Sequence, residues 1–223
     1  MGSIDRDPIR LDPQAPAKRR ALPVTGIVSL PKPGSIPSAF DVVLKGRRSA
    51  EEFSPATFAD LATWLYYVGG VQSVQSTDSN RQRRFVGSFG ALHPAHVLLG
   101  VPEHRWYAYL PRDHCVGQLE VVQEVAVALR TTAMQFHRAE SATIVALLCD
   151  LDLVANYYDN ASELIFRDAG VLFGHAALIA SSLGLPFRIL GATGSDELEH
   201  LVCGLPFRGR SVGLALVGGT KVR

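Results

Sequence analysis

The chain has few cysteines and almost no net charge. Its 223 residues include three cysteines, Cys115, Cys149 and Cys203, which stand far apart in apolar surroundings. An odd, scattered set argues against a disulfide framework or a zinc site and favours a reducing compartment. The net charge is +1, so electrostatics give no reason to expect nucleic acid or an anionic membrane as a partner.

Long hydrophobic runs are also lacking. The first residues, MGSIDRDPIRLD, contain no apolar core of the kind found in a signal peptide. Farther along, no uninterrupted apolar run reaches the ~18–20 residues that span a bilayer. We therefore expect a cytoplasmic protein that does not associate with a membrane.

Several common motifs are absent as well. The sequence contains no GxxxxGK[ST], no GxGxxG before a helix, no HExxH and no paired CxxC. Each of these motifs places specific groups around a phosphate or a metal. Their absence removes support for nucleotide triphosphates, Rossmann-bound dinucleotides and structural zinc, and no metal site is predicted.

What is present divides into an arm and one domain. Residues 1–38 contain seven prolines and a basic patch at Lys18, Arg19 and Arg20, which indicates an extended arm. Within the arm, residues 24–30 are apolar enough for a short edge strand. The remainder, residues 39–223, is long enough for one sizeable domain.

The periodicity of the domain predicts helices and separated strands in mixed order. Helices are expected from Ser38 to Gly46 and over residues 57–68, 116–129 and 196–202, and a polar loop over 72–84. Strands are expected over residues 96–101, 105–110, 143–148, 187–190 and 212–217, the first two forming a hairpin. This mixture favours an α+β fold with a central antiparallel sheet flanked by helices.

The longest predicted element is a helix over residues 163–185. Its second half is apolar on nearly every side, which predicts a helix buried all round. Small residues recur every three or four positions, at Gly170, Gly174, Ala177 and Ser181. Two mid-helix glycines each cost roughly 1 kcal/mol of helix stability relative to alanine. They therefore suggest a tight helix–helix contact, plausibly at a subunit interface.

Three further clusters have the chemistry of a binding site. Arg47, Arg48 and Ser49 follow the end of the first predicted helix and offer fork-like donors and a hydroxyl to a phosphate. A glycine turn over residues 88–92 lets the backbone approach a flat ligand. The tail ends in Lys221 and Arg223, which lie on one face of an extended segment.

In this order the chain resembles the nitroreductase-like flavoprotein family, and most closely its SagB-type branch of thiazoline and oxazoline dehydrogenases. The family's opening RRSxRxF-like stretch reads RRSAEEF here, and the branch's PSxGALYP-like turn reads GSFGALHP. The family's long helix reads LIFRDAGVLFGHAALIASSLGL. The resemblance covers about residues 39–223.

The resemblance implies an FMN-binding homodimer that holds each flavin between its two subunits, with the long buried helix at the interface. The residues that would hold the phosphate and ribityl chain are Arg47, Arg48, Ser49, Lys221 and Arg223. Those that would line the ring are Ser88, Phe89, Gly90 and Ala91. The turn that would face flavin N5 contains Leu190, Gly191 and Ala192.

Two departures from the family's pattern bear on function. The second charged position of the opening motif, usually Arg or Lys, is Glu51, which would oppose a phosphate or turn outward. The branch's Lys-Tyr pair falls on Asn156 and Tyr157, so the lysine is missing. Tyr157 or Tyr158 remains a candidate acid or base, with a structural role as the alternative. The other candidate proton carriers are His93, His137 and His175.

The resemblance implies an FMN-dependent oxidoreductase that passes hydride between a small-molecule or peptide-derived substrate and flavin N5. The SagB-like turn favours a biosynthetic oxidase, with a possible biosynthetic partner protein. Two alternatives stay open. One is an NAD(P)H-dependent nitro or quinone reductase, and the other is a non-catalytic flavin-fold subunit of a larger complex.

Overall fold

A seven-stranded antiparallel sheet organises the chain, with strand order β10-β11-β8-β5-β6-β7-β2. The computed structural model describes residues 7–11, 18–75 and 77–220. The strands of this sheet are β2 (Val24–Ser29), β5 (Ala95–Gly100), β6 (Trp106–Leu110), β7 (Cys115–Leu119), β8 (Thr143–Asp150), β10 (Phe187–Ile189) and β11 (Gly209–Val217). Two small ribbons pair β1 (Ile9–Arg10) with β9 (Tyr158–Asp159), and β3 (Val71–Val74) with β4 (Gln82–Arg84).

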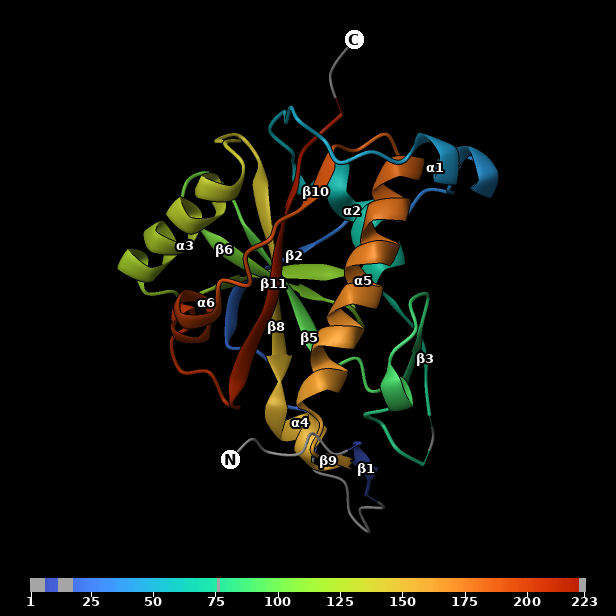
Figure 1. Ribbon diagram of the computed structural model, residues 1–223, viewed down its shortest axis with the longest axis vertical. Helices are drawn as coiled ribbons and strands as arrows, with labels where there is room; N and C mark the ends of the chain where they lie inside the picture. The colour runs from blue at the N-terminus through green and yellow to red at the C-terminus, as the bar shows by residue number, and fades with distance from the viewer. Residues whose placement is uncertain (1–6, 12–17, 76, 221–223) are drawn as a thin grey trace.

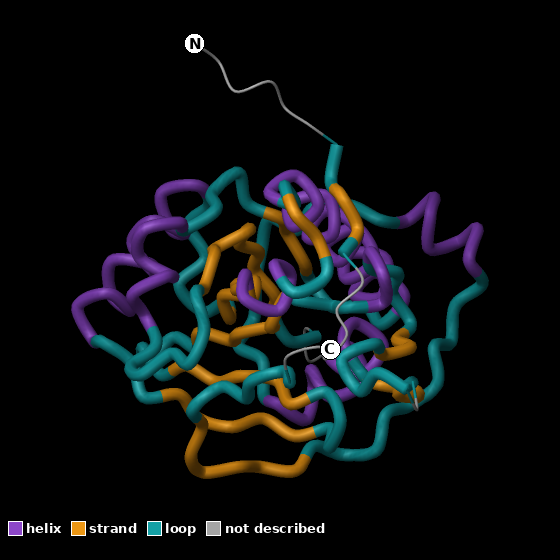
Figure 2. Tube along the Cα trace, turned by 90° about the horizontal axis from the view of Figure 1, so that it is seen from below, coloured by secondary structure: helices purple, strands orange, loops and turns teal. Residues whose placement is uncertain are grey.

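Helices cover both faces of the sheet (Figures 1 and 2). The helices are α1 (Phe40–Gly46), α2 (Phe58–Gly69), α3 (Gln123–Phe136), α4 (Leu151–Ala155), α5 (Ser162–Ser182) and α6 (Ser195–Leu201). β8 is buried along its whole length, and its side chains alternate between two cores. Val145 and Leu147 face the core beneath α2 and α5, whereas Ile144 and Ala146 face the core beneath α3 and α6. The predicted α+β class with a central antiparallel sheet is confirmed.

The α2–α5 pair is fixed by local and tertiary bonds. α2 begins with a capping box, in which the Thr57 side chain accepts from the Asp60 amide and the Asp60 carboxylate accepts from the Thr57 amide. On its buried face, the Trp64 indole Nε1 donates to the Ala176 carbonyl of α5 at 3.0 Å. A buried indole N–H needs such a partner, so this bond sets how α2 lies against α5.

α5 confirms the predicted long helix but not its burial on all sides. Leu172, Phe173 and Ala176 are buried against the sheet and α2. On the opposite side Phe166 is 42% exposed and Val171 48% exposed. The prediction of a helix buried all round is therefore wrong for the single chain, because the packed layers cover only one side of it.

α5 also satisfies the length and composition of a membrane-crossing helix, the one such helix within the described residues. The apolar side chains that give it this composition include Leu172, Phe173 and Ala176, which pack into the core shared with α2 and β11. Asp168 lies within the same helix and is bonded to Ser88. These contacts are those of a core helix.

Two predicted elements are corrected. Residues 72–84, expected as a loop, contain the β3–β4 ribbon. Most β3 side chains are exposed, so no apolar alternation marks the strands. Residues 116–129, expected as one helix, are split between β7 and α3. β7 pairs antiparallel with β6, and this sheet pairing overrides the helical spacing of its apolar residues.

The arm contributes to the sheet. Residues 24–29 form β2, the expected edge strand, which pairs with β7. Upstream of β2, the Arg19 guanidinium donates to the carbonyl oxygens of Asn80, Leu92 and His93. The boundary at residue 38 between arm and domain stays a prediction.

The close packing of α5 on the sheet predicts a strong effect at Gly213. Its φ is +153°, and a Cβ at this position would lie 2.4 Å from the Phe173 ring. We expect Gly213→Ala to lower the free energy of unfolding by about 1–3 kcal/mol through overpacking. Urea unfolding monitored by circular dichroism measures the change. Gly87→Ala is the control, since a Cβ at Gly87 meets nothing within 4 Å; equal stabilities of the two variants would contradict the packing.

Candidate functional site

The motif cleft, a cavity of about 720 Å³, lies where the RRSAEEF stretch meets the end of α5 and the end of β11. It is lined by Gly46, Arg48, Ala50, Glu52, Ser54, Ala177, Ser181, Gly184, Leu185, Pro186, Phe187, Gly219 and Thr220. Segments from the front, middle and tail of the sequence thus share one cavity. Figure 1 shows α1, the end of α5 and the end of β11 at the same end of the molecule.

Backbone hydrogen bonds hold these segments together. The Ala50 amide donates to the Phe187 carbonyl, and the Gly219 amide donates to the Ser54 carbonyl, both at 3.0 Å. A Cβ at Gly219 would lie 2.5 Å from the Pro55 carbonyl oxygen, and one at Gly218 would lie 2.7 Å from that of Ser54. Only glycine allows the tail to approach the motif this closely.

The structure describes three of the five predicted phosphate-binding residues, Arg47, Arg48 and Ser49. Arg48 lines the motif cleft, and its Nη1 donates to the carbonyl oxygens of Lys45 and Arg47 at 2.9 and 2.8 Å. Arg47 is half-buried and Ser49 is exposed beside it. The predicted partners Lys221 and Arg223 lie outside the described residues, directly after Thr220 of the cleft.

Glu51 does not leave an uncompensated negative charge at the motif. Its carboxylate accepts from Arg188 Nη1 at 2.7 Å, and the same Nη1 donates to the Ala50 carbonyl at 2.9 Å. The bond to Arg188 lowers the pKa of Glu51. Sequence reasoning missed Arg188, because the two residues are distant in sequence and meet only when β10 lies beside the motif.

The Ser88 turn, residues 88–91, is tied to the middle of α5. Ser88 Oγ donates to Asp168 Oδ2 at 3.0 Å, and the Phe89 amide donates to Asp168 Oδ1 at 3.2 Å. Burial raises the pKa of Asp168, while the two hydrogen bonds lower it. Sequence reasoning missed Asp168 as the anchor of this turn, because it lies 80 residues after Ser88 in the sequence.

A second cavity of about 410 Å³, the turn cavity, lies between the Ser88 turn and the β3–β4 ribbon. Ser88 and Ala91 line it, together with Arg81 and Arg83. Arg81 Nη1 donates to the Gly90 carbonyl at 2.7 Å. The turn therefore presents backbone and small side chains to an open space beside cationic groups.

The two candidate tyrosines have different surroundings. Tyr157 is buried, its hydroxyl donates to Asp78 at 2.7 Å and accepts from Asn80 at 3.1 Å, and burial raises its pKa. This geometry favours the structural alternative for Tyr157. Tyr158 packs edge-on against Phe89 and is half-buried, which places it beside the Ser88 turn.

The three candidate histidines all bond to backbone carbonyl oxygens. Their Nε2 atoms lie 3.0 Å from the Gln82 oxygen for His93, 3.0 Å from that of Glu51 for His137, and 2.8 Å from that of Tyr67 for His175. Because a carbonyl oxygen only accepts, each Nε2 carries the proton. Burial lowers the pKa of His93 to about 3. These bonds favour structural roles.

The Leu190–Ala192 turn lies on the other side of the sheet's core. Leu190 and Ala192 are buried in the core that α3 and α6 cover, and the Leu190 amide donates to the Leu214 carbonyl. Gly191 is exposed, near the Phe136 ring. Within one chain this turn does not join the Ser88 turn, and its proposed role toward flavin N5 stays a prediction.

The motif cleft and the Ser88 turn lie at different levels of α5. Ser181 lines the cleft and Asp168 anchors the turn. The thirteen residues between these positions correspond to ~20 Å along a helix at 1.5 Å per residue. The structure therefore brings the two predicted halves of the site onto one helix without bringing them into contact.

Comparison with solved structures identifies the fold. A crystal structure from Ralstonia eutropha assigned as a nitroreductase superposes with a TM-score of 0.69 at 20% identity, covering 96% of this chain and 100% of the other. A chain of the Escherichia coli microcin synthetase McbBCD complex with truncated pro-MccB17 gives 0.58 at 14% identity, covering 92% and 71%. An NADH oxidase assignment from Clostridium acetobutylicum gives 0.52 at 15% identity, covering 81% and 89%.

The chain therefore has the nitroreductase-like fold, as the sequence resemblance implied. No family model and no curated protein sequence matches it.

The contact between Asp168 and the Ser88 turn yields a direct test. In Asp168→Ala the Phe89 amide loses its acceptor, and a hydrogen bond to a charged group contributes about 1.5–3 kcal/mol. We expect hydrogen exchange of the Phe89 amide to accelerate roughly tenfold or more in this variant. Arg167→Ala, which removes an exposed neighbour on α5, should leave that rate unchanged. An unaltered Phe89 rate in Asp168→Ala would show that the turn is held by other contacts.

Proposed function

We propose that the protein is an FMN-dependent oxidoreductase that acts as a homodimer. The observation that supports this most strongly is the motif cleft, in which the RRSAEEF stretch, the end of α5 and the residues just before Lys221 converge. A nitroreductase-like fold supplies the context. The bound FMN would supply hydride acceptance and donation at its ring.

The residues of the motif cleft fit a phosphorylated cofactor. Its volume of about 720 Å³ lies within the ~300–1,000 Å³ typical of small-molecule sites. Arg48 Nη1 is bonded only to carbonyl oxygens of its own segment, so the guanidinium can turn toward a phosphate. Gly184, where a Cβ would meet nothing within 4 Å, leaves backbone open on the cleft wall, as close approach of a ligand requires.

In this proposal the chain's own groups bind and orient the cofactor. Arg47, Arg48 and Ser49 hold the phosphate with Lys221 and Arg223 through charge-assisted hydrogen bonds. Arg188 keeps the Glu51 carboxylate occupied, which removes the repulsion that Glu51 would otherwise exert on a phosphate. Ser88, Phe89, Gly90 and Ala91 line the ring, and Tyr158 is the candidate proton carrier beside them.

A homodimer would join the two halves of the site. The midpoint between Asp168 and Ser181 falls at Gly174, where a Cβ would meet nothing within 4 Å. If two copies of α5 cross antiparallel at Gly174, the Ser181 end of one helix reaches the Asp168 end of the other. Two-fold symmetry then forms two equivalent sites, each built from the motif cleft of one subunit and the Ser88 turn of its partner.

Exposed apolar side chains support the same interface. On α1, Phe40 is 67% exposed and Leu44 is 52% exposed, whereas only Val43 of this helix is buried. On α5, Phe166 and Val171 are exposed as well. Figures 1 and 2 show α1 standing out from the body of the chain. Burial of these side chains by a second subunit would be favourable at about 25 cal/mol per Å².

For the reaction, we propose a biosynthetic oxidation of a small-molecule or peptide-derived substrate. The fold likeness to a chain of a microcin synthetase complex, solved with a truncated peptide precursor, supports this choice and the idea of a biosynthetic partner protein. The alternative is an NAD(P)H-dependent nitro or quinone reductase, supported by the NADH oxidase neighbour. Rapid anaerobic bleaching of the flavin by NADH or NADPH would favour that reductase.

The third possibility, a non-catalytic subunit, rests on Glu51 and on the long arm. The Glu51–Arg188 pair weakens the support from Glu51, because the carboxylate already has its cation.

Cofactor binding can be measured directly. Purified protein incubated with FMN should show a bound flavin band at ~450 nm. Arg48→Ala and Arg223→Ala should each weaken FMN binding roughly tenfold or more, because a charge-assisted hydrogen bond contributes about 1.5–3 kcal/mol. Arg208→Ala, which removes an exposed cation just before the start of β11, at the end of that strand opposite the cleft, serves as the control. Protein that binds no FMN would rule out the flavoenzyme.

The dimer is tested by enlarging Gly174. Gly174→Leu should shift the protein toward monomers in sedimentation velocity, because the side chain would prevent close helix contact. Within one chain a Cβ at Gly174 meets nothing within 4 Å, and replacing this glycine improves helix propensity by up to about 1 kcal/mol, so we expect the variant to fold. Thr131→Leu on the exposed side of α3 is the matched control. A monomeric wild type, or a variant that dimerises equally well, would contradict this interface.

A further inference from the structure

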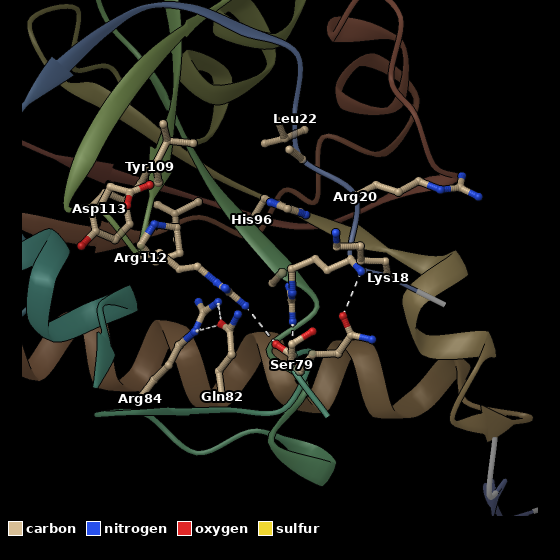
Figure 3. A pocket seen from close by; sticks show the side chains of 17 residues that line it. Lys18, Arg20, Leu22, Ser79, Gln82, Arg84, His96, Tyr109, Arg112 and Asp113 are labelled. Atoms are coloured by element: carbon tan, nitrogen blue, oxygen red, sulfur yellow. Dashed lines mark hydrogen bonds between the residues drawn. The ribbon is translucent and has the colours of Figure 1, made fainter. Parts of the chain in front are cut away.

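A third cavity, the arm pocket, borders the turn cavity, because Gln82 and Arg84 line both. Its volume is about 270 Å³, and its walls are residues 18–22 of the arm, β4, the start of β5 and residues 109–113, which include the end of β6 and the turn after it. The β5–β6 pairing runs from Gly100–Trp106 to Leu98–Ala108 and goes no further. Below Leu98 the two strands separate, and the arm crosses over the space between them (Figure 3).

Three arginines reach this pocket from different elements: Arg19 from the arm, Arg84 from β4 and Arg112 from the turn after β6. In the described part of the chain none of the three forms an ion pair, although Asp113 also lines the pocket. Their hydrogen-bond partners are uncharged oxygens. Arg84 donates to Gln82 Oε1 from Nε and Nη2 at 3.1 and 2.6 Å, and Arg112 donates to the Ser79 carbonyl at 3.0 Å.

Two buried nitrogen atoms at the pocket also lack partners. Arg19 Nε and His96 Nε2 make no hydrogen bond within the described residues. Buried polar groups are nearly always paired with protein, water or ligand, and buried charges need a counter-charge. Among the residues that the structure describes, Arg19 and Arg84 therefore lie in this pocket without an ion pair, beside the unbonded His96 Nε2, whereas Arg112 is exposed at the rim.

Burial lowers the pKa values of two side chains in this pocket, Arg84 and His96. Burial, together with the positive charge of Arg19, lowers the pKa of Arg84 to about 9. Burial likewise lowers the pKa of His96 to about 3, so that imidazole is neutral. The arginines thus repel one another in a space from which water is partly excluded, and an anion between them would relieve the repulsion.

A purely structural role accounts for Arg19 but not for Arg84. Arg19 fastens the arm through the carbonyl oxygens of Asn80, Leu92 and His93. Arg84 bonds only to Gln82, two residues away on its own strand, and so fastens nothing. In Figure 3 the side chains of Arg84 and Arg112 extend into the same space beside Gln82.

We propose that the arm pocket binds a small oxyanion, a phosphate or carboxylate group, between the guanidinium groups of Arg84, Arg112 and Arg19. Guanidinium groups recognise both kinds of oxyanion through paired N–H donors. The volume of about 270 Å³ is below the ~300–1,000 Å³ of drug-sized ligand sites, so the ligand is a small ion or a small metabolite. This pocket shares no lining residue with the motif cleft, where the flavin phosphate would bind.

The test titrates full-length protein with inorganic phosphate and, separately, with acetate, at constant ionic strength adjusted with sodium chloride. We expect at least one of the two anions to raise the Tm saturably, because a ligand that binds only the folded state stabilises it. The anion with the stronger effect identifies the preferred chemistry. Absence of a saturable rise with both anions would overturn the proposal.

Substitutions at the arm pocket test whether the rise in Tm comes from anion binding there. Arg84→Met should weaken anion binding roughly tenfold or more and should melt at a higher temperature than the anion-free wild type, because it removes an unpaired buried charge. Arg112→Gln removes the guanidinium at the rim of the same pocket and should also weaken anion binding. Arg83→Gln, the exposed neighbour on β4, is the matched control. A rise in Tm that persists in both Arg84→Met and Arg112→Gln, or that disappears equally in Arg83→Gln, would refute this assignment.

Phosphate bound in the motif cleft is distinguished by Arg48→Ala, which should keep the anion effect of the arm pocket. Loss of the effect in Arg48→Ala but not in Arg84→Met would assign it to the flavin site and overturn the arm pocket. Failure of the protein to bind FMN, by contrast, would leave this test unaffected.

Discussion

The packing of α5 against the sheet and α2 decides which side of this helix is buried and which side stays exposed. Phe173 lies over Gly213 of β11, and the Trp64 indole holds the Ala176 carbonyl. These contacts fix the rotation of the helix about its own axis. One side is therefore committed to the core, and the side that carries Gly170 and Gly174 is left open. The exposed apolar residues follow from this constraint and not from poor packing.

The same helix relates the two proposed halves of the flavin site. Asp168, in the first half of α5, holds the Ser88 turn. Ser181, at the C-terminal end of α5, lines the motif cleft. A rigid helix keeps these two positions at a constant separation, which a single flexible loop could not do. Two-fold pairing of such a helix can form a complete site only if its centre accepts a close neighbour, and a glycine stands at that centre. In the proposed dimer, the small residues of α5 would allow the close helix contact that joins the two halves of the site.

Sequence patterns predicted elements with a clear local signal and failed where pairing decides the structure. The helix of residues 163–185 has apolar residues at helical spacing, the strand of residues 143–148 is a continuous apolar run, and both exist. β7 was taken for helix because its apolar spacing fits both periods, and only its pairing with β6 resolves the choice. In the site, motifs located the Ser88 turn, but neither Asp168 nor Arg188 could be assigned. Their partners lie eighty and more residues away in sequence, and a contact of that kind has no local signal.

The two cationic regions of the molecule, the RRSAEEF motif and the arm pocket, differ in how their charges are compensated. At the motif, Glu51 and Arg188 neutralise each other at 2.7 Å, and Arg48 remains near the surface where water compensates it. At the arm pocket, Arg84 is surrounded by protein and has only an amide oxygen as its partner. Solvent can stabilise the first arrangement without a ligand, whereas Arg84 loses solvation and, within the described residues, has no carboxylate at ion-pair distance; the charge of Asp168 acts on it only from farther away. This fold places a cation 2.7 Å from the exposed Glu51 carboxylate, and a carboxylate could have been placed beside the buried Arg84 in the same way. An unpaired Arg84 is therefore best explained by an anion that the protein takes from solution.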